Sequence, residues 1–165
     1  MEAVMKYLKP NRFSALILTP IMVLTMICTA YSQNAAEMEE SLFIRLGGLE
    51  QISLVVNDFV DVFIQDPVIL SNPVVKERKT ADTAPYVKFQ VTTMVCQVTG
   101  GPCQYTGLDM REAHRGLNVS KREWDRMVEL FVGTLEKHQV SAEASEELLH
   151  IMGTTKDDIV VSGNR

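Results

Sequence analysis

Apolar residues recur at every third or fourth position along most of this chain, and this spacing constrains the fold more than any other feature. The clearest examples lie between Leu49 and Gln65 and between Ser120 and Leu135. This spacing places apolar side chains on one face of an α-helix. The sequence contains no sustained alternation of apolar and polar residues, which a half-buried strand would require. It therefore predicts an all-α domain whose helices pack through these faces.

Helix-breaking residues set the limits of the first two long helices. The helix from Leu49 to Gln65 ends at Asp66-Pro67. The segment from Val68 to Ala84 has no clear apolar spacing, so we expect a loop with at most one helical turn. Pro85 suits the first turn of the second helix. Thr99-Gly-Gly-Pro102 ends that helix.

Capping residues locate the remaining helices. A short helix follows Asp109 and a long one follows Ser120, and in each case a glutamate three positions further on would complete a capping box. A last helix starts near Ser141, and its regular part ends at Gly153. The sequence thus predicts a bundle of four main helices and one short helix.

The first 32 residues have the pattern of a secretory signal peptide. A basic start precedes an almost wholly apolar run from Phe13 to Cys28, and Ala30-Tyr-Ser32 supplies small residues where a signal peptidase reads them. We expect cleavage after Ser32, export to the periplasm, a mobile lead-in over 33–40 and a single domain over 41–165. Two alternatives remain open: the apolar run stays as a membrane anchor, or Cys28 carries a lipid.

Charge and cysteine content narrow the class of the exported part. The formal net charge of the chain is −5, and charge runs are short and mixed, so nothing resembles the basic footprint of a nucleic-acid-binding protein. Cys96 and Cys103 remain after export, and an oxidising compartment permits them to pair. Cys96 could equally serve as a small apolar core residue.

Three histidines are the candidate metal ligands. We expect His138 to be exposed to solvent and His150 to lie at a boundary. His114 differs, because apolar residues lie one turn away on each side of it. It is either a ligand or a core histidine bonded to a carbonyl. Zinc is less favoured, because Cys96 and Cys103 would bring its ligands to three where a structural site needs four.

Two groups of motifs resemble the group I truncated haemoglobins, and together they span about Ser41 to Met152. The first group resembles the opening of that family: Phe43-Ile-Arg-Leu-Gly-Gly48, Val55-Val-Asn-Asp-Phe59 and Asp66-Pro67. The second group resembles the stretch that leads to the proximal histidine: Thr99-Gly-Gly-Pro102, Tyr105-Thr-Gly107 and Met110-Arg-Glu-Ala-His114.

The resemblance implies a two-over-two helical sandwich around haem b, with His114 as the axial ligand of the iron. His114 would bind through Nε2, while a backbone carbonyl or a water holds its other ring nitrogen. Lys88 or Arg111 would then pair with the haem propionates.

Haem is a large apolar disc, so the site needs two apolar walls. The implied distal wall consists of Val87, Val91, Met94 and Val95. The implied proximal wall consists of Met110, Leu117, Val119, Trp124 and Val128. Phe59 and Phe63 are also expected to contact the haem.

The distal side departs from the family pattern. Val60 stands where many family members have a tyrosine that bonds oxygen, and Asn72-Pro73 stands where the family usually has a phenylalanine. Gln90 is then the best polar candidate, because it lies at the edge of the inner stripe of its helix and its amide can donate to bound oxygen. The alternative for Gln90 is an exposed side chain.

Three functions of different classes follow from this pattern. The favoured function is a haem b globin that reversibly binds oxygen or another diatomic gas, NO or CO, in the periplasm. The second is an enzyme on the same scaffold that converts nitric oxide and oxygen to nitrate with an electron donor. The third is a haem-free helical interaction module. Val60 removes a donor that tightly held oxygen would use, so we expect a gas-binding protein more than an enzyme.

Overall fold

The computed structural model describes residues 41–78 and 83–161, and this part of the chain is helical. An isolated bridge between Val119 and Val160 is its single β-type pairing. The expected signal peptide (1–32) and lead-in (33–40) lie outside the described residues. Within the described part, no helix is both long and apolar enough to cross a membrane.

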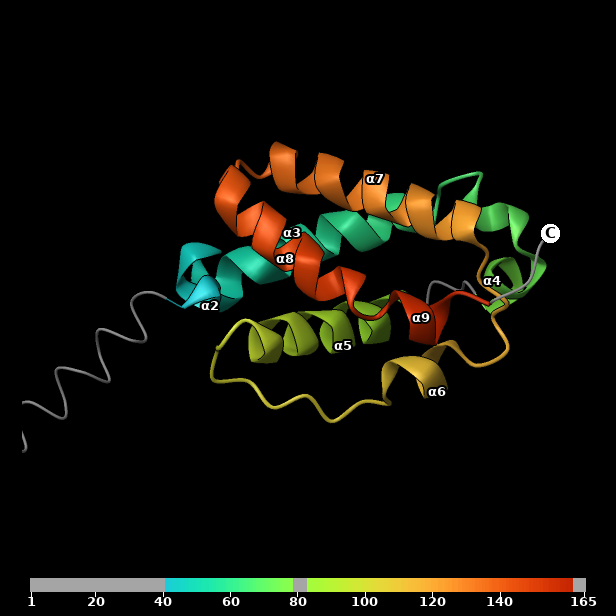
Figure 1. The fold of residues 1–165 in the computed structure, drawn as a ribbon, viewed down its shortest axis with the longest axis horizontal. Helices are drawn as coiled ribbons and strands as arrows, with labels where there is room; N and C mark the ends of the chain where they lie inside the picture. Colours follow the sequence, from blue (N-terminus) through green and yellow to red (C-terminus); the bar gives the residue numbers. More distant parts are fainter. Residues whose placement is uncertain (1–40, 79–82, 162–165) are drawn as a thin grey trace, which may run out of the picture. The chain divides into compact units, whose positions relative to one another are not determined.

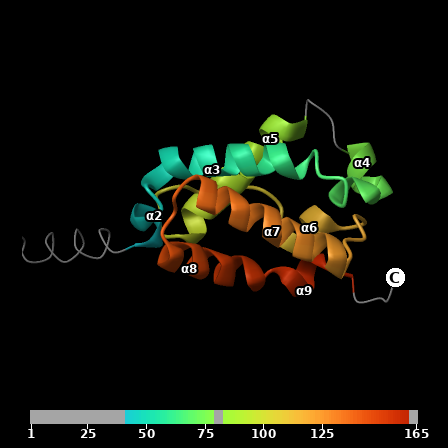
Figure 2. The same ribbon diagram turned by 90° about the horizontal axis from the view of Figure 1, so that it is seen from above.

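Four helices of three or more turns form the body of the domain (Figure 1). They are α3 (Gly48–Phe63), α5 (Thr83–Val98), α7 (Lys121–Lys137) and α8 (Ala142–Gly153). Helix α3 packs against both α5 and α7, and α7 packs against α8 (Figure 2). The pair α3 and α5 thus faces the pair α7 and α8. The all-α prediction and its four main helices are confirmed.

Short elements are more numerous than the sequence predicted. They are α2 (Leu42–Arg45), η1 (Ile69–Ser71), α4 (Pro73–Arg78), α6 (Met110–His114) and α9 (Lys156–Ile159). The expectation of one short helix was therefore wrong in number. Helix α6 is the one that was predicted, and α9 carries the chain beyond the predicted stop at Gly153.

The segment after α3 is more helical than the expected loop because two side chains cap its turns. The Oδ1 of Asp66 accepts from the amides of Val68 and Ile69, at 2.9 and 3.2 Å. The Oδ1 of Asn72 accepts from the amide of Val74 at 3.0 Å, and Pro73 follows at the first helical position. An asparagine cap before a proline at this position is a strong start for a helix.

The core lies between α3, α7 and α8 and also includes α2 and the end of α5. Its buried residues are Leu42, Phe43, Leu46, Ile52, Val55, Val56, Val60, Val95, Cys96, Phe131, Leu135, Ala144 and Leu148. Val60, at the position of the family tyrosine, belongs to this core and is 2% exposed. Burial of these apolar side chains is the main favourable contribution to folding.

The predicted caps are confirmed, one of them in part. Ser120 and Glu123 form the complete capping box at the start of α7. At α6 the side chain of Asp109 accepts from the amide of Glu112 at 2.8 Å. The carboxylate of Glu112 pairs with Arg115, so it does not complete the second box.

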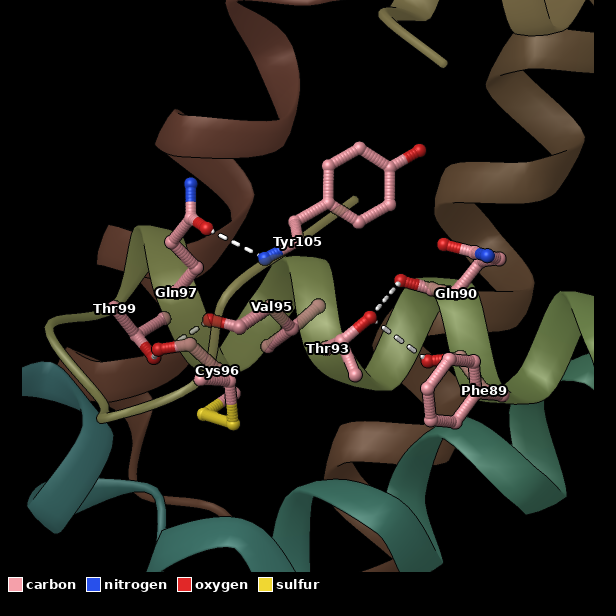
Figure 3. Close-up of a disulfide and its surroundings, with 9 residues drawn as sticks. Phe89, Gln90, Thr93, Val95, Cys96, Gln97, Thr99 and Tyr105 are labelled. Carbon is pink, nitrogen blue, oxygen red and sulfur yellow. Dashed lines mark hydrogen bonds between the residues drawn. A yellow bond between two sulfur atoms is a disulfide. The ribbon is translucent and has the colours of Figure 1, made fainter. Parts of the chain in front are cut away.

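A disulfide between Cys96 and Cys103 closes the corner that ends α5 (Figure 3). Their Cα atoms lie 5.7 Å apart, and Cys96 is fully buried. Both expectations for Cys96 therefore hold, as a disulfide partner and as a core residue. At Gly101 an added Cβ would lie 2.7 Å from the sulfur of Cys96 and 2.4 Å from the ring of Phe43, so this corner requires glycine.

Candidate functional site

His114 is the last residue of α6, and its ring is oriented by the backbone of the same helix. Its Nδ1 lies 2.8 Å from the carbonyl oxygen of Met110. Because a carbonyl can only accept, Nδ1 carries the hydrogen and Nε2 keeps its lone pair. Within residues 41–78 and 83–161 no hydrogen bond occupies Nε2. The half-buried imidazole therefore has the tautomer that a metal ligand needs.

The two elements beside His114 carry apolar side chains that the protein itself does not bury. In α5 only Val95 and Cys96, both in its last turns, are buried, although the helix has apolar residues along its whole length. In α6 no residue is buried. Apolar surface of this kind marks a site for an apolar ligand or partner.

The predicted wall residues differ in how much the protein covers them. Val87 is 41% exposed, whereas Val95 and Trp124 are buried. The other members are half-buried: Phe59, Phe63, Val91, Met94, Met110, Leu117, Val119 and Val128. The ring of Phe59 also contacts Phe63 and Phe131, at centroid distances of 5.8 and 5.0 Å, so it is shared with the core.

Gln90 points from α5 toward the loop that leads to α6, on the same side of the helix as Tyr105 (Figure 3). A Cβ added to Gly107 would lie 2.7 Å from Oε1 of Gln90 and 2.3 Å from the Tyr105 hydroxyl, so these three residues are in close contact. The Oε1 of Gln90 is buried and has no hydrogen-bond partner in the described part of the chain. Gln90 is therefore not an exposed surface glutamine.

Tyr105 joins this loop to α5 and closes a turn within the loop, just before α6. Its amide donates to Oε1 of Gln97 at 2.6 Å, and its hydroxyl donates to the carbonyl of Leu108 at 2.7 Å. Burial raises the pKa of the Tyr105 hydroxyl from its ordinary value, so the hydroxyl remains a donor at neutral pH. The Tyr-x-Gly motif is thus a packing motif: the ring covers the backbone at Gly107, where a side chain would collide with it.

The two cations suggested for the propionates already have partners. The Nζ of Lys88 lies 2.7 Å from Oδ1 of Asp61 and 2.8 Å from Oδ1 of Asn57, both on α3. Arg111 pairs with Asp158 on α9. A role for either cation toward haem would require an exchange of these partners.

The expectations for the other two histidines were wrong. The side chain of His138 is only 15% exposed, because α7 ends against α3 and its Nε2 lies 2.8 Å from Oδ2 of Asp58. The Nδ1 of His138 lies 3.4 Å from the Gln51 amide. His150 is exposed on α8, not at a boundary. Of the three, His114 is the half-buried histidine that keeps one ring nitrogen without a hydrogen bond within the described residues.

The disulfide bears directly on the zinc alternative. The sulfurs of Cys96 and Cys103 are bonded to each other, so they are not available as thiolate ligands beside His114. Within the described residues no three histidine, cysteine or acidic side chains are grouped so that they could hold a metal ion.

Comparison with known proteins identifies the family. Residues 41–161, a range that contains the whole described part, match the family of bacterial-like globins. The chain belongs to this family. The resemblance of its motifs to the group I truncated haemoglobins is confirmed, because two curated relatives carry that description.

These relatives of the globin come from two Tetrahymena species. The group 1 truncated hemoglobin of Tetrahymena pyriformis is 30% identical over 71 residues, which are 43% of this chain and 59% of the relative. That of Tetrahymena thermophila is 30% identical over 69 residues, 42% of this chain and 57% of the relative. Each match thus covers less than two thirds of the relative.

Solved structures support the fold of this globin. The Fe(III) form of truncated hemoglobin from Tetrahymena pyriformis superposes with a TM-score of 0.61 at 24% identity, over 73% of this chain and 98% of that one. A tyrosine-to-phenylalanine mutant of the same Tetrahymena protein gives the same values. The predicted truncated-globin fold is therefore confirmed.

Membership of a globin family implies haem, and the residues present fit that group. A haem would cover the uncovered apolar faces of α5 and α6, and Nε2 of His114 is the available ligand atom. The Oε1 of Gln90 is a buried polar atom for which the described part of the chain provides no hydrogen-bond partner.

Two anchoring side chains were not found from the sequence. Asn72 donates to the carbonyl of Leu117 at 2.8 Å, and buried Asp66 pairs with Arg126 of α7 at 2.9 Å. The Asp-Pro and Asn-Pro dipeptides marked both as helix boundaries. Their partners lie 45 and 60 residues further along the chain, which no local pattern indicates.

Proposed function

We propose that this globin binds haem b through His114 and reversibly binds a diatomic gas, with oxygen favoured. The observation that carries the proposal is the contact between Nδ1 of His114 and the carbonyl of Met110. In the neutral imidazole this contact places the hydrogen on Nδ1 and the lone pair on Nε2, and it holds the plane of the ring.

Different residues of the chain would bind the iron of the haem and cover its apolar ring. His114 supplies the axial nitrogen, and the Met110 carbonyl raises its basicity through the hydrogen bond at Nδ1. The half-buried apolar residues of α5 and α6 exclude water from both faces of the disc. When bound, haem supplies the iron at which a gas molecule is taken up. Gln90, directed toward the loop before α6, would supply an amide donor on the side of α5.

An absorption spectrum of the purified protein, with and without a reductant, tests this proposal. We expect a Soret band and one haem per chain. His114→Ala should abolish stable haem uptake. His150→Ala is the matched control, because His150 is exposed on α8, and it should retain full uptake. Equal haem content in His114→Ala and the wild type would refute the assignment.

We favour gas binding over nitric oxide dioxygenation because of Val60. Its side chain lies in the core and has no donor with which to hold oxygen tightly. Steady consumption of nitric oxide in the presence of oxygen and an electron donor would favour the enzyme instead. If the protein shows no Soret band after addition of hemin, the result would favour the third function, a haem-free helical interaction module.

We also propose that the chain is exported and cleaved after Ser32, and acts in the periplasm. The basic start and apolar run support export. The Cys96–Cys103 disulfide is in keeping with an oxidising compartment. Mass spectrometry of protein from the native host should find residue 33 at the N-terminus. An intact Met1 in the cytoplasm would contradict export, and a lipid adduct on Cys28 would support a lipoprotein in its place.

A further inference from the structure

We propose that Asn72 is a positioning residue for His114, because its side-chain amide holds the connector between α6 and α7 against the segment that precedes α4. The inference rests on the proposed role of His114 as the haem ligand. The hydrogen bond from Asn72 would keep α6, a short helix without buried residues, at a defined place.

Helix α6 has little packing of its own to define its position. It has five residues and none of them is buried. Apolar burial, which locates α3 and α7 in the core, therefore does not locate α6. Contacts with other elements must supply that restraint.

Leu117 joins the histidine to such a contact. Its amide donates to the carbonyl of His114 at 3.0 Å, and its own carbonyl accepts from Nδ2 of Asn72 at 2.8 Å. The residue that closes the end of α6 is thus the residue that Asn72 holds. A displacement of the Leu117 carbonyl would move the Leu117 amide as well, and with it the hydrogen bond to the carbonyl of His114.

The backbone around Leu117 needs an external restraint. Gly116 and Asn118 have φ angles of 74° and 52°, so left-handed conformations flank Leu117 on both sides. Such a conformation is unfavourable for a residue other than glycine and persists where surrounding contacts hold it. The hydrogen bond from Asn72 is one contact of this kind.

Asn72 is itself held in one orientation. It is 6% exposed, and its Oδ1 accepts from the amides of Val74 and Val75 at the start of α4. With the oxygen committed to these donors, Nδ2 is the atom that faces Leu117. The amide therefore bridges two elements with a fixed direction.

The segment that carries Asn72 is tied to the body of the domain. Asp66, 6% exposed, bonds Arg126 on α7 and caps η1 through the amides of Val68 and Ile69. Asn72 thus connects the α6–α7 connector to a segment that is already fixed on α7.

A second set of contacts holds the same region from the C-terminal side. The amide of Val161 donates to the carbonyl of Val119 at 3.0 Å, and Arg111 of α6 pairs with Asp158 of α9. Figure 1 shows α6 beside α9, in agreement with their packing. Asn72 supplies the restraint from the opposite side, near α4.

Two substitutions distinguish the hydrogen bond from Asn72 to Leu117 from the cap that Asn72 provides for α4. Asn72→Ser and Asn72→Asp both keep an oxygen that can cap α4, and both remove the amide donor to Leu117. Ser141→Ala is the matched control, because it removes the cap of α8, in which Ser141 accepts from Ala144, and so lowers stability far from α6.

Two measurements report on position, and one of them needs no haem. In the protein without haem, hydrogen exchange at the Leu117 amide should become faster in both Asn72 variants and stay unchanged in Ser141→Ala. In the haem-loaded protein, both variants should lose haem to an acceptor globin about fivefold faster, as expected for one hydrogen bond of ordinary strength. Their iron–histidine stretching frequency should shift, which a general loss of stability would not cause.

The outcomes distinguish this inference from the proposed function. A wild-type protein that takes up no haem, or takes it up equally with His114→Ala, refutes the function and with it the role of Asn72 toward the ligand. A wild-type protein that binds through His114, with Asn72 variants that match it in exchange, haem loss and stretching frequency, overturns the positioning role alone.

Discussion

Asp58 of α3 and His138 at the end of α7 are joined by a 2.8 Å contact between Oδ2 and Nε2, although 80 residues separate them in the sequence. Lys137 approaches the same carboxylate oxygen, with its Nζ at 2.7 Å. The hydrogen bonds from Lys137 and His138 lower the pKa of Asp58 to about 2. This cluster links α3 to the end of α7.

The lowered pKa makes a prediction for acid stability. A carboxylate with a folded-state pKa below its unfolded value of about 3.9 stabilises the fold above that pH and loses its contribution as the pH falls toward 2. Asp58→Asn should therefore reduce the free energy of unfolding at pH 5, and the difference from wild type should shrink as the pH approaches 2. Urea unfolding across this range measures it, with Glu146→Gln as the control for loss of a surface carboxylate. A difference that stays constant with pH would contradict the prediction.

Two glycines, one at the corner after α5 and one on α7, predict opposite effects when each is replaced by alanine. Gly101→Ala places a Cβ 2.7 Å from the carbonyl oxygen of Cys96, which is backbone and cannot move freely. It should lower the free energy of unfolding by about 1–3 kcal/mol. Gly133→Ala, on α7 with no atom within 4 Å of the new Cβ, should raise it by about 0.5–1 kcal/mol. Thermal unfolding of both variants tests this pair of predictions. A change of the free energy of unfolding in the same direction in both variants would contradict it.

The disulfide should contribute modestly to stability. It closes a short loop, with a separation of seven residues between Cys96 and Cys103. The loop-entropy account predicts a loss of about 2 kcal/mol when it is absent. Cys103→Ser, measured by denaturant unfolding against the oxidised wild type, tests this value. Two titratable thiols in the native oxidised protein would show that the bridge does not form.

Gln90 makes a prediction for the rate at which oxygen leaves. The end of its side chain is buried beside Gly107, in the loop that leads to α6, and a neutral hydrogen bond contributes about 1 kcal/mol net. Gln90→Leu should therefore speed oxygen dissociation roughly five- to tenfold, since 1.4 kcal/mol corresponds to a factor of ten. Stopped-flow measurement of the dissociation rate is the test. Gln97 is exposed, and the bond from the Tyr105 amide to its Oε1 holds its side chain at the loop, so an unchanged rate would indicate that a water donates instead.

Val60 allows the complementary experiment. Val60→Tyr places a hydroxyl donor at the position of the family tyrosine and should slow oxygen dissociation if the ring reaches the pocket. Val60 is only 2% exposed in a packed core, so the same substitution should also lower the free energy of unfolding, by about 1–3 kcal/mol. Slower dissociation with a weakened fold is the expected pair of results. Faster dissociation would contradict the proposed lack of a donor.

Local signals predicted the elements that local physics governs. The caps at Ser120 and Asp109 and the glycine corner after Val98 act within a few residues. The starts of α6 and α7 and the end of α5 could therefore be predicted from sequence. The segment after Pro67 was misjudged for the opposite reason. Its apolar spacing is weak, and its turns depend on the caps from Asp66 and Asn72, both of which are held by partners far along the chain.

His114 and His138 show where prediction from sequence ends. The sequence by itself determined that His114 lies on a short capped helix, because the cap at Asp109 and the helix act within one or two turns. It also determined the all-α class, because helical spacing alone decides which faces can be buried. Only the tertiary structure decided that His138 is enclosed by Asp58 and Gln51, and that Asn72 reaches Leu117. Hydrogen bonds between residues tens of positions apart depend on how whole helices pack, and that packing is set by the buried core as a whole rather than by the residues that form the bonds.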